Sequence, residues 1–259
     1  MPKVGYTMVD DALRAPGNEG RAPFMSHLKE LRNRILYSAI ALGLGLLVGM
    51  FFGSPIIRIL KLPSHNIQLI TMTLMEPMFV YFRVSILTAV IIAMPFLVYQ
   101  FLAFVAPGLT AKEKRIVFTA LPAITLMFLL GVAFAYFIAL PPALNFLYHF
   151  NNAIAEPLPS LSNYISMVIR ILLVIGLVFE TPLIIMALAR LGVVSPQWLA
   201  ARRKWWILIA FIIAAIATPT PDPFDQTVVA VPLILLLELG ILLARLVYKK
   251  KRSPVQQTI

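Results

Sequence analysis

Six long apolar stretches divide this chain of 259 residues, and short segments rich in charged residues separate them. A helix needs about 20 apolar residues to cross roughly 30 Å of hydrocarbon. The pattern therefore predicts an all-α polytopic membrane protein with six transmembrane helices. The predicted spans are approximately Ile35–Phe52, Met78–Phe101, Ile116–Ala139, Tyr164–Ala189, Trp205–Thr218 and Thr227–Ala244.

The last two spans are predicted to be short. Between Lys204 and Asp222 there is room for only about 14 apolar residues, or roughly 21 Å of helix at 1.5 Å per residue. We therefore expect the membrane to be thinned locally beside helices five and six. Prolines lie inside four of the spans, where each removes a backbone hydrogen bond and favours a static kink, so we expect a concave bundle. These prolines are Pro95, Pro122, Pro182 and Pro232.

Composition agrees with a membrane protein and argues against a catalytic centre. Hydrophobic residues make up 60% of the chain and charged residues 13%, which is too little polar surface for a water-soluble globule of this size. The chain has no cysteine, and His27, His65 and His149 lie in separate segments with no carboxylate or serine at an active-site spacing. We predict no catalytic residue, no metal and no cofactor.

The basic residues predict the orientation and the domain limits. With the N-terminus inside, almost all Lys and Arg fall on the inner side, and only Arg58 and Lys61 remain in outside loops. Both termini are therefore expected in the cytoplasm, with a disordered extension at 1–22, a membrane domain at 23–248 and a basic tail at 249–259. The net charge of +11 reads as a topology signal. It gives little support to a nucleic-acid partner, while the basic run from Lys249 to Arg252 favours contact with anionic membrane lipid.

Four separated segments carry a resemblance to a known family. They read HLKELRNR at 27–34, EPMFVYFR at 76–83 continuing to APGLTAKEKR at 106–115, FETP at 179–182, and AIATPTPDPFDQ at 215–226. Read together and in this order, they resemble the TatC family of twin-arginine protein translocases, over about residues 25–248.

The chain departs mildly from that family's pattern. Arg83 stands where Lys is usual, Leu102 where Trp is usual, Asp225 where Ser is common and Leu237 where Tyr is usual. Arg170 belongs to no pattern of the family.

The resemblance implies a function and partners. It implies the receptor core of a translocase driven by the proton-motive force, which recognises twin-arginine signal peptides of folded precursor proteins for export across the cytoplasmic membrane. It also implies single-span Tat partner subunits packed on helices five and six, in a hetero-oligomer.

Two cytoplasmic carboxylates are candidates for binding the signal peptide. Glu30 and Glu113 stand among basic side chains, and a carboxylate binds guanidinium through planar bidentate hydrogen bonds that Lys cannot make. Structural roles are open for both, because Glu30 can pair with Arg34 at i+4 and Glu113 can complete a capping box with Thr110. The resemblance implies that these glutamates take part in binding the arginine pair. The predicted peptide-binding set is Glu30, Arg32, Phe104, Glu113 and Arg115.

Glu180 is predicted to lie deep in the membrane, about 24 Å and 15 Å from the two ends of its helix. A carboxyl there costs at least about 2.5 kcal/mol, so it should face protein or a water-filled hollow. We expect a polar contact with a partner helix, and a buried carboxyl bonded to a neighbouring Ser or Thr is the alternative. A rival function is a small proton-coupled secondary transporter that uses Glu180 and Arg170 as a relay, although the spans show no repeat.

Structural roles are expected for the acidic and basic residues near the outer face. Glu76 is expected to cap span two, and Arg83, two turns further on, to find another partner. Asp222 is the expected turn residue between prolines. Near the inner face, Glu238 and Arg245 are expected to meet only through solvent or a third group.

Overall fold

The computed structural model describes residues 21–64, 68–106, 110–149, 158–190, 192–218 and 223–248. Within these residues the chain is helical nearly throughout, and its one β-type pairing is an isolated bridge between Ile70 and Ser160. The predicted all-α class is confirmed. The helical elements are α1 (Arg21–Lys61), η1 (Leu62–Ser64), α2 (Glu76–Val105), α3 (Ala111–Thr119), α4 (Leu121–Phe134), η3 (Ala135–Ala139), α5 (Leu140–His149), α6 (Leu161–Val178), α7 (Thr181–Arg190), α8 (Pro196–Ala201), α9 (Arg203–Ala217) and α10 (Pro223–Val247).

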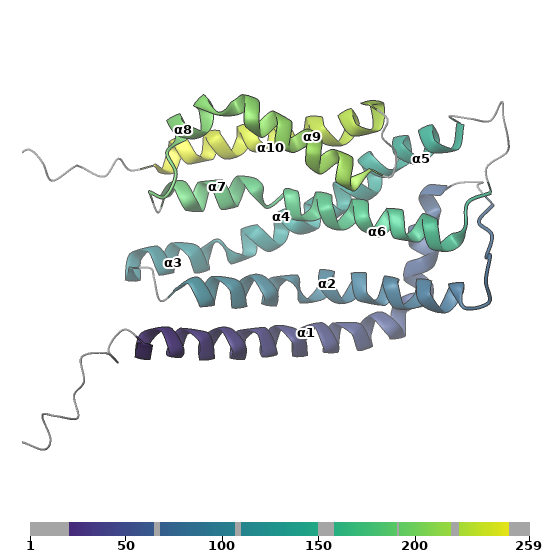
Figure 1. The fold of residues 1–259 in the computed structure, drawn as a ribbon, viewed down its shortest axis with the longest axis horizontal. Coiled ribbons are helices and arrows are strands. Elements are labelled where there is room, and N and C mark those ends of the chain that lie inside the picture. Colours follow the sequence, from purple (N-terminus) through teal and green to yellow (C-terminus); the bar gives the residue numbers. More distant parts are fainter. Residues whose placement is uncertain are drawn as a thin grey trace, which may run out of the picture.

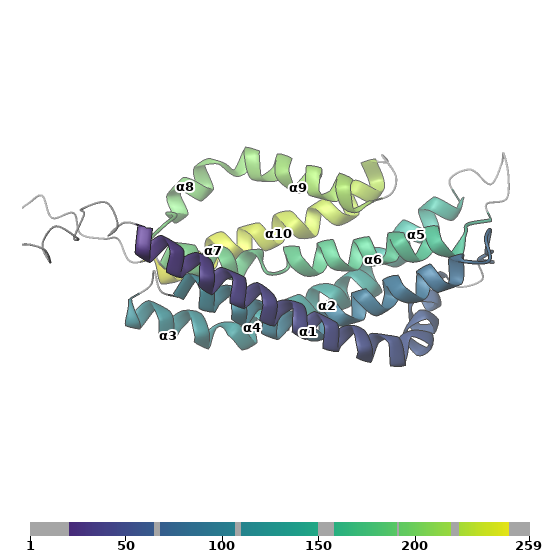
Figure 2. The ribbon, with the colours of Figure 1, turned by 60° about the horizontal axis from the view of Figure 1, so that its bottom comes forward.

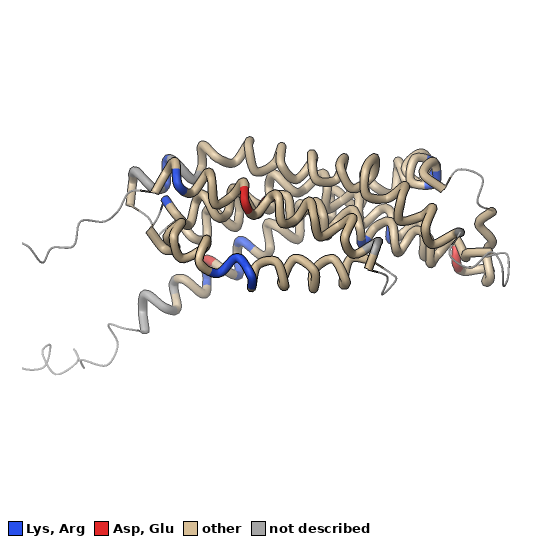
Figure 3. Tube along the Cα trace, turned by 90° about the horizontal axis from the view of Figure 1, so that it is seen from above, with Lys and Arg blue, Asp and Glu red and all other residues tan. Residues whose placement is uncertain are grey.

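The helices run back and forth along one axis, so that the described part of the chain makes six passes between two ends (Figure 1). The passes are α1, α2, α3 to α5, α6 with α7, α9, and α10. The first residue of α1 and the last residue of α10 lie at the same end, which we call the terminal end. We call the opposite end, where α2 and α6 begin, the clasp end. Lys and Arg gather mainly toward the terminal end, and the middle of the bundle holds few charges (Figure 3).

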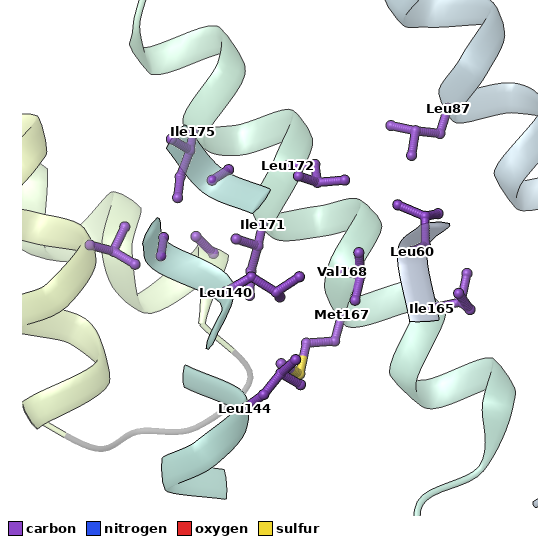
Figure 4. Packing of buried hydrophobic residues seen from close by; sticks show 14 of the residues in the cluster. Leu60, Leu87, Leu140, Leu144, Ile165, Met167, Val168, Ile171, Leu172 and Ile175 are labelled. Atoms are coloured by element: carbon purple, nitrogen blue, oxygen red, sulfur yellow. The ribbon is translucent and has the colours of Figure 1, made fainter. Parts of the chain in front are cut away.

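The passes form a layered bundle. The long helix α1 lies at one edge and packs on α2, which in turn packs on α4 and α6; α7 and α10 follow, and α9 lies at the other edge (Figures 1 and 2). The main core lies between these layers, where Leu140, Ile165 and Ile171 are completely buried among side chains from α1, α2, α9 and α10 (Figure 4). Large apolar side chains also cover the outer surface, such as Phe51, which is 89% exposed. An apolar exterior around an apolar core is the arrangement of a membrane protein.

The short fifth span is confirmed, and the short sixth span is wrong. Five described stretches are long and apolar enough to cross a membrane, and α9 is not among them. With 15 residues, α9 is about 22 Å long. By contrast α10 has 25 residues and is about 37 Å long. The prediction took only the apolar centre of α10, whereas the helix starts earlier at Pro223, a residue well suited to a first turn.

Two of the four span prolines break their helices instead of bending them. Pro95 and Pro232 lie inside continuous helices, as predicted. Pro122 lies in the first turn of α4, after an interruption at Ala120, and Pro182 lies in the first turn of α7. A proline has no backbone N–H to donate, which costs nothing in a first turn but breaks the ladder elsewhere. Span four is therefore two helices joined at Phe179 and Glu180.

The third pass is longer than predicted. The pass contains one π-helical turn at Ala135–Ala139 and continues directly into α5, so it reaches His149, 10 residues beyond the predicted end at Ala139. Pro141 and Pro142 fall in the first turn of α5, directly after the π turn, where the missing N–H groups are tolerated.

Glycines on α1 allow close contact with α2. Gly45, Gly49 and Gly53 recur every four residues and all three are buried. A Cβ added at Gly49 would lie 2.5 Å from the Ser85 carbonyl oxygen, a distance that real Cβ atoms do not adopt. Small residues at this spacing let membrane helices approach closely, because apolar side chains gain little by leaving lipid. Our sequence reasoning missed this pattern although it is readable from the spacing alone.

We expect Gly49→Ala to destabilise the protein and Gly43→Ala to leave it as stable as the parent. The added methyl at Gly49 meets α2 backbone, and overpacking of this kind costs about 1–3 kcal/mol. A Cβ at Gly43 meets nothing within 4 Å, so that variant is a matched control. Thermal unfolding of both variants in the same detergent measures the difference. Equal melting temperatures would contradict the close α1–α2 contact.

Candidate functional site

Glu30 belongs to a polar cluster at the terminal end. Arg34, one turn further along α1, donates from Nε to Glu30 Oε1 at 3.0 Å. The His27 Nδ1 atom lies 3.8 Å from Glu30 Oε2. Arg34 also donates from Nη1 to the Gln100 side-chain oxygen on α2 at 3.2 Å. The structural pairing of Glu30 with Arg34 is thus present, while the Glu30 carboxylate remains 30% exposed and accessible.

Phe104 completes this cluster from α2. Its ring stacks on His27, with centroids 4.4 Å apart and planes inclined by 18°. Gln100 and Phe104 are one turn apart on α2, as are His27, Glu30 and Arg34 on α1, so each helix presents one face to the other. We call these five residues the terminal-end cluster. The sequence analysis did not predict that His27 and Gln100 belong to this site. Their helical spacing from Glu30 and Phe104 would have indicated it.

The other predicted peptide-binding residues are on α1 and α3. Arg32 is exposed on α1 and Arg115 is exposed on α3. Glu113 lies in the first turns of α3, and its side chain is outside the described residues. The structure therefore brings Glu30 and Phe104 into one cluster and leaves Arg32 and Arg115 exposed on α1 and α3.

Glu180 lies at the junction between α6 and α7. Its carbonyl oxygen accepts hydrogen bonds from the Leu183 and Ile184 amides, so its backbone starts α7. Its side chain is 7% exposed. The Oε1 atom is buried, and no described donor reaches it. The alternative, a hydrogen bond from a neighbouring Ser or Thr to this oxygen, is therefore absent among the described residues.

Glu76 joins two helix starts at the clasp end. The loop before α2 meets the loop before α6, where the Ile70 amide donates to the Pro159 carbonyl at 3.2 Å and the Leu161 amide donates to the Ile70 carbonyl at 2.8 Å. Glu76 Oε1 accepts from the Ser162 amide and Oε2 from the Met72 amide, both at 2.7 Å. The expected cap on span two is therefore wrong. Glu76 caps α6, because its side chain reaches across to that helix's free amides.

Arg83 finds its partners on α6. Its Nη1 atom donates to the Ser162 hydroxyl at 2.9 Å and to the Ser166 hydroxyl at 2.6 Å. Ser162 and Ser166 lie one turn apart on the same face of α6. Asp222 lies outside the described residues, and the side chain of Asp225 does too.

Glu238 pairs with Arg203, which sequence reasoning did not foresee. Arg203 Nε lies 2.7 Å from Glu238 Oε1, and Arg203 Nη2 donates to Oε2 at 2.8 Å. This bidentate pair links α9 to α10, and no direct ion pair between Glu238 and Arg245 is present among the described residues. No group of three or more His, Cys, Asp or Glu among the described residues could hold a metal ion.

Comparison with known proteins identifies the family. Residues 26–232 match the family described as Sec-independent protein translocase protein (TatC). The chain belongs to the TatC family. It is 39% identical to the Sec-independent protein translocase protein TatC of Aquifex aeolicus, over 89% of this chain and 98% of that protein. It is also 39% identical to the TatC protein of Desulforapulum autotrophicum, over 92% of this chain and 90% of the relative.

Solved structures agree with this assignment. A crystal structure described as a twin arginine translocase receptor, TatC, superposes with a TM-score of 0.76 at 40% identity, covering 85% of this chain and 99% of that one. The chain is thus a membrane-embedded TatC protein, a component of a Sec-independent protein translocase. The alternative of a small secondary transporter is not supported. Glu180 and Arg170 do not form a relay either, since one is buried at a helix junction and the other is exposed ten residues earlier.

Proposed function

We propose that this TatC protein is the receptor subunit that recognises twin-arginine signal peptides of folded precursors. The terminal-end cluster is the observation that supports the proposal most directly. It presents an accessible carboxylate, Glu30, beside an aromatic ring, Phe104, on a fold shared with a structure named as a twin-arginine translocase receptor. A carboxylate selects guanidinium over ammonium because it can form two parallel hydrogen bonds with it.

Glu30 and Glu113 are the two proposed acceptors for the arginine pair. Glu30 already binds one guanidinium, that of Arg34, whose Nε and Nη2 atoms both donate to the single oxygen Oε1. Arg32 and Arg115 are exposed on α1 and α3 and belong to the proposed peptide-binding set. Phe104 offers an apolar surface to the residues that follow the arginines.

Partner contacts are proposed at the other edge of the bundle. The outer face of α9 and α10 carries exposed Ile and Leu side chains, including Ile212 and Leu235. The short α9 leaves the membrane thinned beside it, which favours a partner helix of matching short length. We therefore propose that single-span Tat partner subunits pack on α9 and α10, in a hetero-oligomer of the cytoplasmic membrane.

Peptide selectivity tests the receptor function. Purified protein should bind a synthetic twin-arginine signal peptide, and replacing both peptide arginines by lysine should weaken binding at least tenfold, because lysine cannot form the bidentate bond. Fluorescence anisotropy of a labelled peptide measures both affinities under one salt condition. Equal affinity for the two peptides would contradict the receptor proposal.

The proposed orientation puts the terminal end in the cytoplasm. Single cysteines can be placed cleanly since the chain has none. We expect Leu74→Cys, at a position 97% exposed near the clasp end, to react with an impermeant maleimide from outside intact cells. Val193→Cys, at a position 67% exposed near the terminal end, should react only after lysis. Labelling of Val193→Cys in intact cells would overturn this topology.

A further inference from the structure

Two arginines lie on one exposed face near the clasp end and have no described acidic partner. Arg83 on α2 bonds only to the neutral hydroxyls of Ser162 and Ser166. Arg170 follows Ser166 by one turn on the same face of α6, is exposed, and makes no hydrogen bond or ion pair with the described residues. The face thus carries two positive charges that these residues do not neutralise.

The one described carboxylate near this face is already committed. Glu76 is buried, and its two oxygens accept the Ser162 and Met72 amides. Glu180 lies ten residues beyond Arg170, about 15 Å further along the pass. Neither carboxylate forms an ion pair with Arg83 or Arg170 within the described structure.

Depth and surroundings indicate what neutralises the pair. Arg83 lies about 10 Å, and Arg170 about 14 Å, from the first residue of its helix. Arginines at such depth reach the headgroup level by extending their side chains along the helix. One turn to either side of Arg83, Phe79 and Ile86 are each 53% exposed on the same face of α2. The face therefore offers a cationic centre flanked by apolar surface.

We propose that Arg83 and Arg170 bind the phosphodiester of a phospholipid in the leaflet at the clasp end, whose acyl chains lie over Phe79 and Ile86. The serine hydroxyls hold Nη1 of Arg83, and no described acceptor reaches its other guanidinium nitrogens, so they are free to donate to phosphate. Arg170 supplies a second donor on α6, about 6 Å along the helix beyond Ser166. Arginine matches phosphate bidentately, and a soluble anion would leave the apolar flanks uncovered.

Lipid binding to the detergent-purified protein tests this site. The probes are dioleoyl phosphatidylglycerol, dioleoylglycerol, which has the same acyl chains and no phosphate, and inorganic phosphate. Arg170→Gln is the main variant, since Arg170 holds no described contact that the fold would lose. Arg58→Gln is the matched control, because Arg58 is an exposed arginine near the same end on α1. Native mass spectrometry across a lipid titration gives each affinity.

We expect Arg170→Gln to weaken phosphatidylglycerol binding about tenfold or more, and Arg58→Gln to change it less than twofold. Arg83→Lys should weaken phosphatidylglycerol binding several-fold, because the positive charge remains while the bidentate guanidinium geometry is lost. Dioleoylglycerol should not saturate the site, and inorganic phosphate should not displace the bound lipid. Unchanged lipid affinity in Arg170→Gln would overturn the proposal, as would equal binding of dioleoylglycerol or displacement by phosphate. Loss of a co-purifying partner subunit with unchanged lipid affinity would assign the face to an acidic protein partner instead.

Discussion

Glu30→Ala and Glu113→Ala are each expected to weaken the binding of a twin-arginine signal peptide roughly ten- to a hundredfold while the protein still folds and inserts. Each substitution removes one partner of a charge-assisted hydrogen bond, which is worth about 1.5–3 kcal/mol. Peptide titration with both purified variants, at fixed salt, measures the loss. The double variant should bind no more tightly than the weaker single variant.

The geometry around Glu30 gives this prediction its physical basis. In the free protein the Glu30 carboxylate is held by Arg34 at 3.0 Å, so an incoming arginine must share it or replace that partner. Arg34 would not be stranded by the exchange, since it also donates to Gln100 at 3.2 Å. Replacement of one guanidinium by another costs little, which makes Glu30 a carboxylate that can change partners without loss of the fold.

A charge-matched control separates this site from a general effect of charge. Glu238→Ala removes one negative charge as well, but its carboxylate pairs with Arg203 between α9 and α10, away from the terminal-end cluster. Peptide affinity should stay within twofold of the parent in Glu238→Ala. Unchanged affinity in a folded Glu30→Ala/Glu113→Ala double variant would leave both glutamates with structural roles only.

The fold class and the span pattern could be predicted because they depend on local composition. A span is recognisable as a run of apolar residues, and the short α9 followed from the distance between Lys204 and Asp222 alone. The helix breaks were harder to predict. Pro95 and Pro182 both stand inside apolar runs, yet one lies within a continuous helix and the other starts a new one. Whether a proline bends a helix or starts a new one depends on how neighbouring helices pack against it. That packing cannot be read from the residues around the proline.

The polar partners could not be predicted because they join distant parts of the chain. Glu76 binds the amide of Ser162, 86 positions away, and Arg203 binds Glu238, 35 positions away. Sequence reasoning considered neighbours at helical spacing, and for Glu30 and Arg34 that was sufficient. For Glu76 it gave the wrong helix. The candidate site was thus predictable where its contacts lie within one helix, and elsewhere only through resemblance to a family.

Glu180→Ala is expected to abolish transport while expression and melting temperature remain normal. The reason is a contrast between two buried carboxylates. Glu76 is 6% exposed and satisfies two backbone amides, as a structural carboxylate should. Glu180 is 7% exposed, but its Oε1 atom has no described donor. A carboxyl that costs energy in the membrane and makes no side-chain hydrogen bond or ion pair with the described residues is best explained by a polar partner supplied from another protein.

Two further variants make the test decisive. Glu180→Gln keeps the shape and one acceptor oxygen, so it should retain much of the assembly with the single-span partner and much of the transport. Glu76→Ala is the reference for a structural role: it leaves the Met72 and Ser162 amides without their acceptor, at about 1–3 kcal/mol each, and should lower the melting temperature. Transport and thermal unfolding are measured together on all three variants. If Glu180→Ala loses melting temperature in step with transport, as Glu76→Ala should, then Glu180 holds the α6–α7 junction together and the partner contact is wrong.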